Sequence, residues 1–253
     1  MTESAIAKRF GAAATTYDRA ANIQRAVAAD LLTLCPPTNP AKILEIGCGT
    51  GNYTALLHEA FPNAGITATD VSPAMVRLAS AKIHNNRVRF HVADAHAYPD
   101  GPYDLITANA ALHWLPDLGD ALARFSESLH PGSSLVFSYF GRETYRELRS
   151  ALTKTLATDV SLASNAFATP TDLATMLKRH YRTVEIRTVG YREDFSSLRE
   201  LLANIRASGT QGPGASPKIA WTPGLLRRVE RQYLEEFGAI TATYQVTLCR
   251  SDR

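Results

Sequence analysis

The segment KILEIGCGTGNYTALLHEAF, residues 42–61, decides the fold of this chain. A short apolar run is followed directly by Gly47, Gly49 and Gly51, and then by a helical pattern that Pro62 ends. Glycines between a buried strand and a helix let the backbone turn sharply and approach a ligand closely. The segment therefore predicts a strand, a ligand-binding loop and a helix in that order.

After residue 61 the predicted strands and helices continue to alternate. Apolar runs predict strands over residues 65–70, 88–94, 103–112 and 133–140. Helical spacing of apolar residues lies between them, over residues 72–83 and 118–129. This alternation predicts an α/β fold with a doubly wound, mostly parallel sheet and helices on both faces.

The two ends of the chain show different patterns. Residues 4–34 predict a helix that Gly11 and the Thr15–Thr16 pair interrupt, and three prolines in residues 35–40 predict a hinge after it. Beyond Gly141 the pattern predicts further helices, a strand or two over 181–195, a final strand over 239–251, and a Gly- and Pro-rich loop over 210–218. We expect one domain, 1–253, with a helical cap (1–34), a ligand-binding core (41–141) and a substrate- or partner-binding half that completes the sheet (142–253).

The composition narrows the class of protein. The chain has 253 residues, 45% of them hydrophobic, and no apolar run long enough to span a membrane. It shows no secretory signal and only three cysteines without a CxxC pair, so we expect a cytoplasmic protein. His91, Asp94 and His96 alternate at a strand end, a pattern more typical of a loop than of metal ligands, and we expect no metal.

The charge is distributed unevenly. Residues 1–141 carry 10 Lys and Arg against 12 Asp and Glu, whereas residues 142–253 carry 17 against 12. The net charge of +3 is too small to indicate nucleic acid. A basic C-terminal half favours an anionic substrate or an acidic partner, and a solvated surface of mixed charge is the alternative.

The glycine spacing is GxGxG rather than the GxGxxG of dinucleotide-binding folds. It resembles motif I of class I S-adenosylmethionine (SAM) methyltransferases. The resemblance implies that Gly47, Cys48, Gly49 and Gly51 enclose the amino-acid part of SAM, and that Glu45 holds its ammonium group.

The next strand ends carry matching residues. Asp70 ends the second predicted strand, where a carboxylate can accept hydrogen bonds from both ribose hydroxyls. Val71 and Met75 follow and can lie against the adenine ring. Asp94 and Ala95 end the third strand, where such enzymes bind the adenine amine.

After the fourth strand comes Asn109 to Trp114, where the resemblance implies an aromatic residue or histidine, here His113, beside the methyl group. Each element alone is ambiguous. Together, however, the four elements follow one another at the carboxyl ends of successive strands, which is where doubly wound sheets bind ligands.

The flanks resemble a narrower family, the malonyl-[acyl-carrier protein] O-methyltransferases. The similarity lies in FGAAATTYD at 10–18 with Gln24, in residues 202–212, in Trp221-Thr222-Pro223 and in residues 243–246. In that family the N-terminal helix closes over SAM, which implies that Tyr17 lies near the cofactor.

The resemblance implies methyl transfer from SAM to the free carboxylate of a malonyl thioester on acyl carrier protein or coenzyme A, a step in biotin synthesis. A carboxylate is already ionised at neutral pH, so no general base is needed. We predict His113, Tyr17 and Arg206 as catalytic residues. Further candidates to hold the malonyl group are Trp114, Tyr139 and Arg142.

Two predicted helices carry arginines at helical spacing and are candidates for a basic docking face, namely Arg142, Arg146 and Arg149, and Arg227, Arg228 and Arg231. Two alternative functions remain open. The chain could methylate another small molecule, such as trans-aconitate, an amine or a phenol, or it could bind SAM without catalysis.

Overall fold

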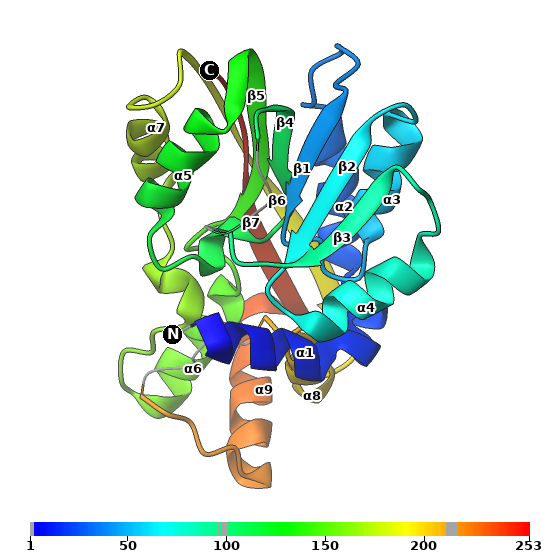
Figure 1. Ribbon diagram of the computed structural model, residues 1–253. Coiled ribbons are helices and arrows are strands. Elements are labelled where there is room, and N and C mark those ends of the chain that lie inside the picture. The colour runs from blue at the N-terminus through cyan, green and yellow to red at the C-terminus, as the bar shows by residue number, and fades with distance from the viewer. Residues whose placement is uncertain (1–2, 96, 98–100, 211–216) are drawn as a thin grey trace.

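The computed structural model describes residues 3–95, 97, 101–210 and 217–253. Seven strands form one sheet in the order β3-β2-β1-β4-β5-β7-β6 (Figure 1). The strands are β1 (Lys42–Ile46), β2 (Gly65–Asp70), β3 (Val88–Val92), β4 (Tyr103–Ala108), β5 (Leu129–Phe140), β6 (Thr183–Phe195) and β7 (Ile240–Asp252). Strands β1 to β5 pair in parallel, and β7 pairs antiparallel with both β5 and β6. The predicted doubly wound α/β class is confirmed.

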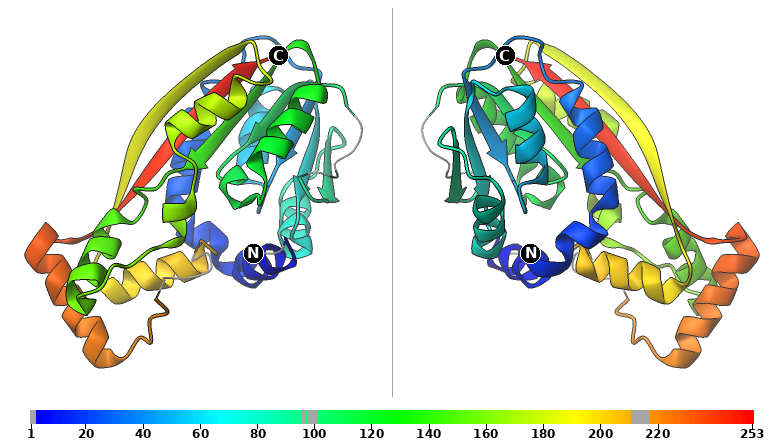
Figure 2. Two further views of the ribbon diagram at one scale, coloured as in Figure 1. Left: turned by 90° about the vertical axis from the view of Figure 1, so that its left-hand side faces the viewer. Right: turned by 90° about the vertical axis from the view of Figure 1, so that its right-hand side faces the viewer.

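Helices cover both faces of the sheet. Helices α2 (Asn22–Leu32) and α3 (Asn52–Ala60) lie on one face, and α5 (Leu118–Glu127) and α7 (Pro170–Leu177) lie on the other (Figure 2). The sheet interior is buried on both sides, as the fully buried side chains of Leu44, Ile106 and Phe137 show. The remaining helices are α1 (Glu3–Ala20), α4 (Pro73–Lys82), α6 (Arg146–Leu156), α8 (Leu198–Ala207) and α9 (Pro223–Phe237).

The predicted helix over residues 4–34 is interrupted, but at Ala21, between α1 and α2, and not at the predicted Gly11 and Thr15–Thr16. Helix α1 continues through Gly11 and Thr16 and ends at Ala20. The Thr16 hydroxyl donates to the Ala13 carbonyl within the helix, so this β-branched residue is accommodated without a break. A Cβ on Gly11 would lie 3.4 Å from Ser72 Oγ, which places α1 tightly against the start of α4.

The start of β5 also differs from the prediction. The sequence predicted that a helix runs to residue 129 and that Pro131 and Gly132 follow it as a break. In the structure α5 ends at Glu127 and β5 already begins at Leu129, because Leu129 pairs with Tyr103 of β4. Tertiary pairing thus overrides the local signal.

Three smaller points complete the comparison. Residues 183–195 form one strand, which pairs along its whole length with β7. Most of the predicted Gly- and Pro-rich loop, residues 211–216, lies outside the described residues, as does His96. Within the part of the chain that is described, no helix is long and apolar enough to cross a bilayer.

Helix α1 crosses the carboxyl end of the sheet between α4 and α8 (Figure 1). Gly209, just after α8, has a φ of +68°, and a Cβ there would lie 2.9 Å from the Phe10 ring. Glycine therefore allows the end of α8 to approach α1 closely. The Thr16 hydroxyl also lies 3.1 Å from the Ala207 carbonyl, which joins the same two helices.

Candidate functional site

A cavity lies between the carboxyl ends of the first strands and α1. It has a volume of about 100 Å³, and its wall includes residues from all four predicted motifs and from the N-terminal helix. The predicted cofactor residues on this wall are Tyr17, Gly47, Gly49, Asp70, Val71, Met75, Asp94, Ala95 and Asn109. The structure therefore brings together nine residues that the sequence spreads over more than 90 positions.

The glycine loop is anchored to the end of β2. The amides of Gly47 and Cys48 both donate to the Thr69 carbonyl, at 2.7 and 2.9 Å. Gly47 has a φ of +73°, and a Cβ there would lie 2.4 Å from the Ala111 Cβ. Only glycine fits this close approach, and the loop can therefore lie directly against the segment after β4.

Asp70 links the loop to the start of α4. Its Oδ2 accepts a hydrogen bond from the Gly49 amide at 2.9 Å, and its Oδ1 accepts one from the Ser72 amide at 2.8 Å. Burial raises the pKa of Asp70 above its usual value, although the two amide hydrogen bonds act in the opposite direction. The carboxylate is thus held at the cavity wall with acceptor capacity to spare.

Three predicted cofactor residues do not line the cavity. Glu45, Cys48 and Gly51 are absent from its wall, and Gly51 instead begins α3 and packs against Ala79. Glu45 is buried, and its Oε2 has no hydrogen-bond partner among the described residues. Burial, together with the charge of Asp70, raises the pKa of Glu45 to about 8.

The N-terminal helix is fastened over this cavity. Tyr17 lies on the cavity wall, and burial and the neighbouring Asp70 carboxylate raise the pKa of its hydroxyl. Asp18 accepts hydrogen bonds from the Thr50 hydroxyl at 2.5 Å and from Asn52 at 3.0 Å, and it forms an ion pair with Lys82 at 3.0 Å. Burial would raise the pKa of Asp18, but these three partners lower it below its usual value. Asp18 therefore joins α1 to the glycine loop.

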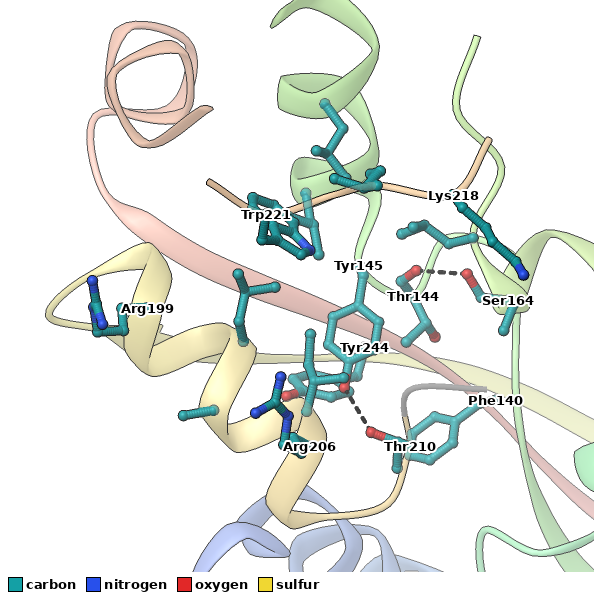
Figure 3. A pocket seen from close by; sticks show the side chains of 18 of the residues that line it. Phe140, Thr144, Tyr145, Ser164, Arg199, Arg206, Thr210, Lys218, Trp221 and Tyr244 are labelled. Carbon is teal, nitrogen blue, oxygen red and sulfur yellow. Dashed lines mark hydrogen bonds between the residues drawn. The ribbon is translucent and has the colours of Figure 1, made fainter. Parts of the chain in front are cut away.

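A second and larger cavity, of about 770 Å³, lies between α6, α8 and the segment before α9 (Figure 3). Trp114 lines both cavities, so the two spaces share this side chain as part of their walls. His113 and Arg206, predicted as catalytic, both line the larger cavity, whereas Tyr17 lines only the smaller one.

His113 is buried within a cage of aromatic rings. The ring centroids of Trp114, Phe140 and Phe167 lie 4.8, 5.1 and 4.9 Å from its own. Burial, reinforced by the positive charge of Arg9, lowers the pKa of His113 to about 3. Its Nδ1 is buried without a hydrogen-bond partner in the described chain. His113 is therefore a neutral side chain with unused hydrogen-bonding capacity.

The other candidates for the malonyl group lie elsewhere. Arg142 donates from Nε to the Phe167 carbonyl and lies 3.8 Å from Asp172. The Tyr139 hydroxyl accepts a hydrogen bond from the Ala168 amide. Neither Arg142 nor Tyr139 is on the wall of either cavity.

Sequence reasoning did not assign several wall residues of the smaller cavity. Ile6 and Phe10 reach it from α1, and Ala111, Leu112 and Pro116 reach it from the segment after β4. The helical spacing of Ile6 and Phe10 is compatible with any buried helix face, so it carries no sign of a ligand. Asn109 lines the cavity, but its amide is already engaged with the Gln24 carbonyl and the Ser138 hydroxyl.

Comparison with known proteins gives matches along most of the chain. A family model described as a methyltransferase domain matches residues 44–135. The malonyl-[acyl-carrier protein] O-methyltransferase of Bacillus cereus is 31% identical over 96% of this chain and 95% of its own length. The enzyme of the same name from Anoxybacillus flavithermus is 33% identical over 94% of this chain and 92% of its own length. Phosphoethanolamine N-methyltransferase 2 of Haemonchus contortus, solved with SAM, superposes with a TM-score of 0.58 at 15% identity, over all of this chain and 57% of that one.

The sheet order, the glycine loop and the domain match define a class I methyltransferase fold. The full-length similarity goes further, and the chain belongs to the family of malonyl-[acyl-carrier protein] O-methyltransferases.

Proposed function

We propose that this protein transfers the methyl group of SAM to the free carboxylate of a malonyl thioester on acyl carrier protein or coenzyme A. The observation that carries the proposal is that two cavities lie next to each other and share Trp114 as a wall. One is built from the glycine loop and Asp70, and the other is apolar with cationic side chains. Family membership supports the same acceptor.

In this proposal the smaller cavity holds SAM. Asp70 accepts the ribose hydroxyls, Val71 and Met75 contact adenine, and Asp94 with Ala95 binds its amine. Glu45 lies behind the loop, and its unpartnered Oε2 favours a cation such as the ammonium group. Gly47, Cys48, Gly49 and Gly51 shape the loop around the amino-acid part.

The cap must open for the cofactor to enter. A volume of about 100 Å³ is below the range of about 300–1,000 Å³ that is typical of ligand sites. Tyr17 and Phe10 of α1 occupy part of the wall, so outward movement of α1 would enlarge the space. Residues 1–34 would then close over SAM, 41–141 would hold it, and 142–253 would receive the acceptor.

SAM supplies an electrophilic methyl group on a sulfonium. The protein needs to align a carboxylate oxygen with that methyl and to exclude water, which can lower a barrier by about 7–11 kcal/mol. Arg206 can hold the carboxylate from the larger cavity. A neutral His113 can donate one hydrogen bond without a full charge, which would leave the oxygen nucleophilic.

The direct test uses purified protein with methyl-labelled SAM. We expect label in malonyl-carrier protein or malonyl-CoA, released as methanol by mild base. Methylation of trans-aconitate but of neither malonyl thioester would contradict the proposed acceptor. SAM binding in equilibrium dialysis without any methylation would support the non-catalytic alternative.

Arg206→Gln should lower kcat/KM for malonyl thioesters by about 10- to 100-fold, because one charge-assisted hydrogen bond of about 1.5–3 kcal/mol is lost. The dissociation constant of SAM should stay unchanged, since Arg206 is not on the wall of the smaller cavity. Arg187→Gln is the matched control, because Arg187 is exposed on β6 and lines neither cavity. Equal effects of the two substitutions would exclude a specific role for Arg206.

SAM binding should depend on pH through Glu45. Below its pKa of about 8 this carboxyl is mainly neutral, and an arriving ammonium favours the ionised form, so binding releases a proton. The affinity should therefore rise by about 20- to 30-fold from pH 6.0 to 7.5, because the slope approaches one proton per pH unit below the pKa. Calorimetry in buffers of different ionisation enthalpy would measure this release. Glu45→Gln should flatten the profile, and an unchanged slope in that variant would contradict the assignment.

A further inference from the structure

The larger cavity has a one-sided charge. Three cations, Arg199, Arg206 and Lys218, lie on its wall, and no acidic side chain is among the described residues that line it. No ion pair of these three cations occurs within the described chain. The cavity therefore favours an anionic ligand at more than one point.

The three cations are all exposed, but they lie at different distances from the smaller cavity. The C-terminal end of α8, after Arg206, packs against α1, whose Phe10 and Tyr17 line the smaller cavity. Arg199 is seven residues earlier on α8, which corresponds to about 10 Å along the helix axis. At that end the Leu198 amide donates to Glu230 of α9. Of the two arginines on α8, Arg206 is thus the nearer to the smaller cavity and Arg199 the farther from it.

Lys218 approaches the cavity from another wall. It is exposed on the segment that leads to α9, opposite Arg199 in the close view (Figure 3). Trp221 of the same segment is 40% exposed and lies between the two cations in that view. Leu202 and Leu226 add apolar surface to the same wall. An apolar wall with one cation near the smaller cavity and two farther from it fits an elongated ligand with an anion at each end.

The structure also shows that ion pairs neutralise the predicted basic face at α6, but only one arginine of the predicted face on α9. Arg149 pairs with Glu143 at 3.6 Å, and Arg231 lies 3.9 Å from Glu235. Arg146 likewise pairs with Glu147 at 3.1 Å. By contrast, two carboxylates near Arg199 form hydrogen bonds with other groups. Glu200, the next residue in the chain, accepts a hydrogen bond from the Ser196 amide. Glu230 of α9 accepts one from the Leu198 amide at the start of α8.

We propose that Arg199 and Lys218 bind the phosphodiester of the phosphopantetheine arm that carries the malonyl thioester, while the arm runs along the apolar wall toward Arg206. This inference rests on the proposed function. It places the specificity for a phosphorylated arm in the larger cavity rather than on the faces of α6 or α9.

The test compares three acceptors that differ by one part: malonyl-pantetheine, malonyl-phosphopantetheine and malonyl-carrier protein. Wild type should use the phosphorylated arm with a kcat/KM about tenfold higher than the arm without phosphate, because exposed charge pairs contribute modestly. Arg199→Gln and Lys218→Gln should each raise KM for malonyl-phosphopantetheine about threefold, and together about tenfold, with kcat unchanged. None of these variants should change the kinetics with malonyl-pantetheine.

Arg187→Gln is again the matched control, and SAM binding verifies that each variant is folded. Equal use of the two arms by wild type would overturn the proposal, and this comparison needs no variant. If the variants lose the same activity with malonyl-pantetheine as with malonyl-phosphopantetheine, the proposal is also overturned. A loss of activity seen only with malonyl-carrier protein would overturn it in favour of a protein-docking role. If wild type methylates none of the three acceptors, the proposed function itself fails.

Discussion

Asp70→Ala should raise the dissociation constant of SAM by at least roughly 100-fold, because two charge-assisted hydrogen bonds to the ribose contribute about 3 kcal/mol together. The substitution also leaves the Gly49 and Ser72 amides without their acceptor. The loop and the ribose site are therefore lost together. Equilibrium dialysis with labelled SAM measures the effect directly.

A matched control for Asp70 exists at the opposite end of the strands, where Asp104 lies near the start of β4. Asp104 also accepts two backbone amides through one carboxylate, those of Ala41 and Lys42, each at 2.9 Å. Asp104→Ala should lower the free energy of unfolding by about 1 kcal/mol and leave SAM affinity unchanged. Equal loss of SAM affinity in both variants would show that Asp70 acts through stability alone.

Gly47→Ala should abolish SAM binding and lower the free energy of unfolding by about 2–4 kcal/mol. The new Cβ would lie 2.4 Å from the Ala111 Cβ, far inside van der Waals contact, and the φ of +73° is unfavourable for alanine. The loop must move away from the segment after β4, which breaks the wall of the smaller cavity. Thermal unfolding and SAM dialysis measure the two effects.

Gly132→Ala separates backbone strain from the clash. Gly132 has a φ of +83°, yet a Cβ there meets nothing within 4 Å, and the residue is remote from both cavities. We expect a loss of about 1 kcal/mol in stability and normal SAM binding. If Gly47→Ala behaves in the same way, the close approach to Ala111 has no role in the site.

The convergence of the proposed cofactor residues on one cavity could be predicted largely from the sequence. In a parallel sheet the carboxyl ends of neighbouring strands lie at one edge, so Asp70, Asp94 and Asn109 must converge once their strands are recognised. The depth of each residue could not be predicted in this way. Glu45 and Cys48 belong to the same motif as Gly49, but the turn of the loop places them behind the wall.

The acceptor side depended on partners that are distant in the chain. Arg142, Arg146 and Arg149 share a helical spacing that indicates a basic face, but Asp172, Glu147 and Glu143 neutralise them. Arg199 received no role from its sequence context. It matters because α8, α6 and the segment before α9 enclose one cavity.

Local pattern alone determined the class of fold and the cofactor loop, because glycine spacing and strand–helix alternation are properties of neighbouring residues. The early start of β5 and the larger cavity were decided only in the tertiary structure. Both arise from contacts between segments far apart in the chain, such as Leu129 with Tyr103. The energies of such contacts exceed local propensities, and a linear sequence does not show which segments will meet.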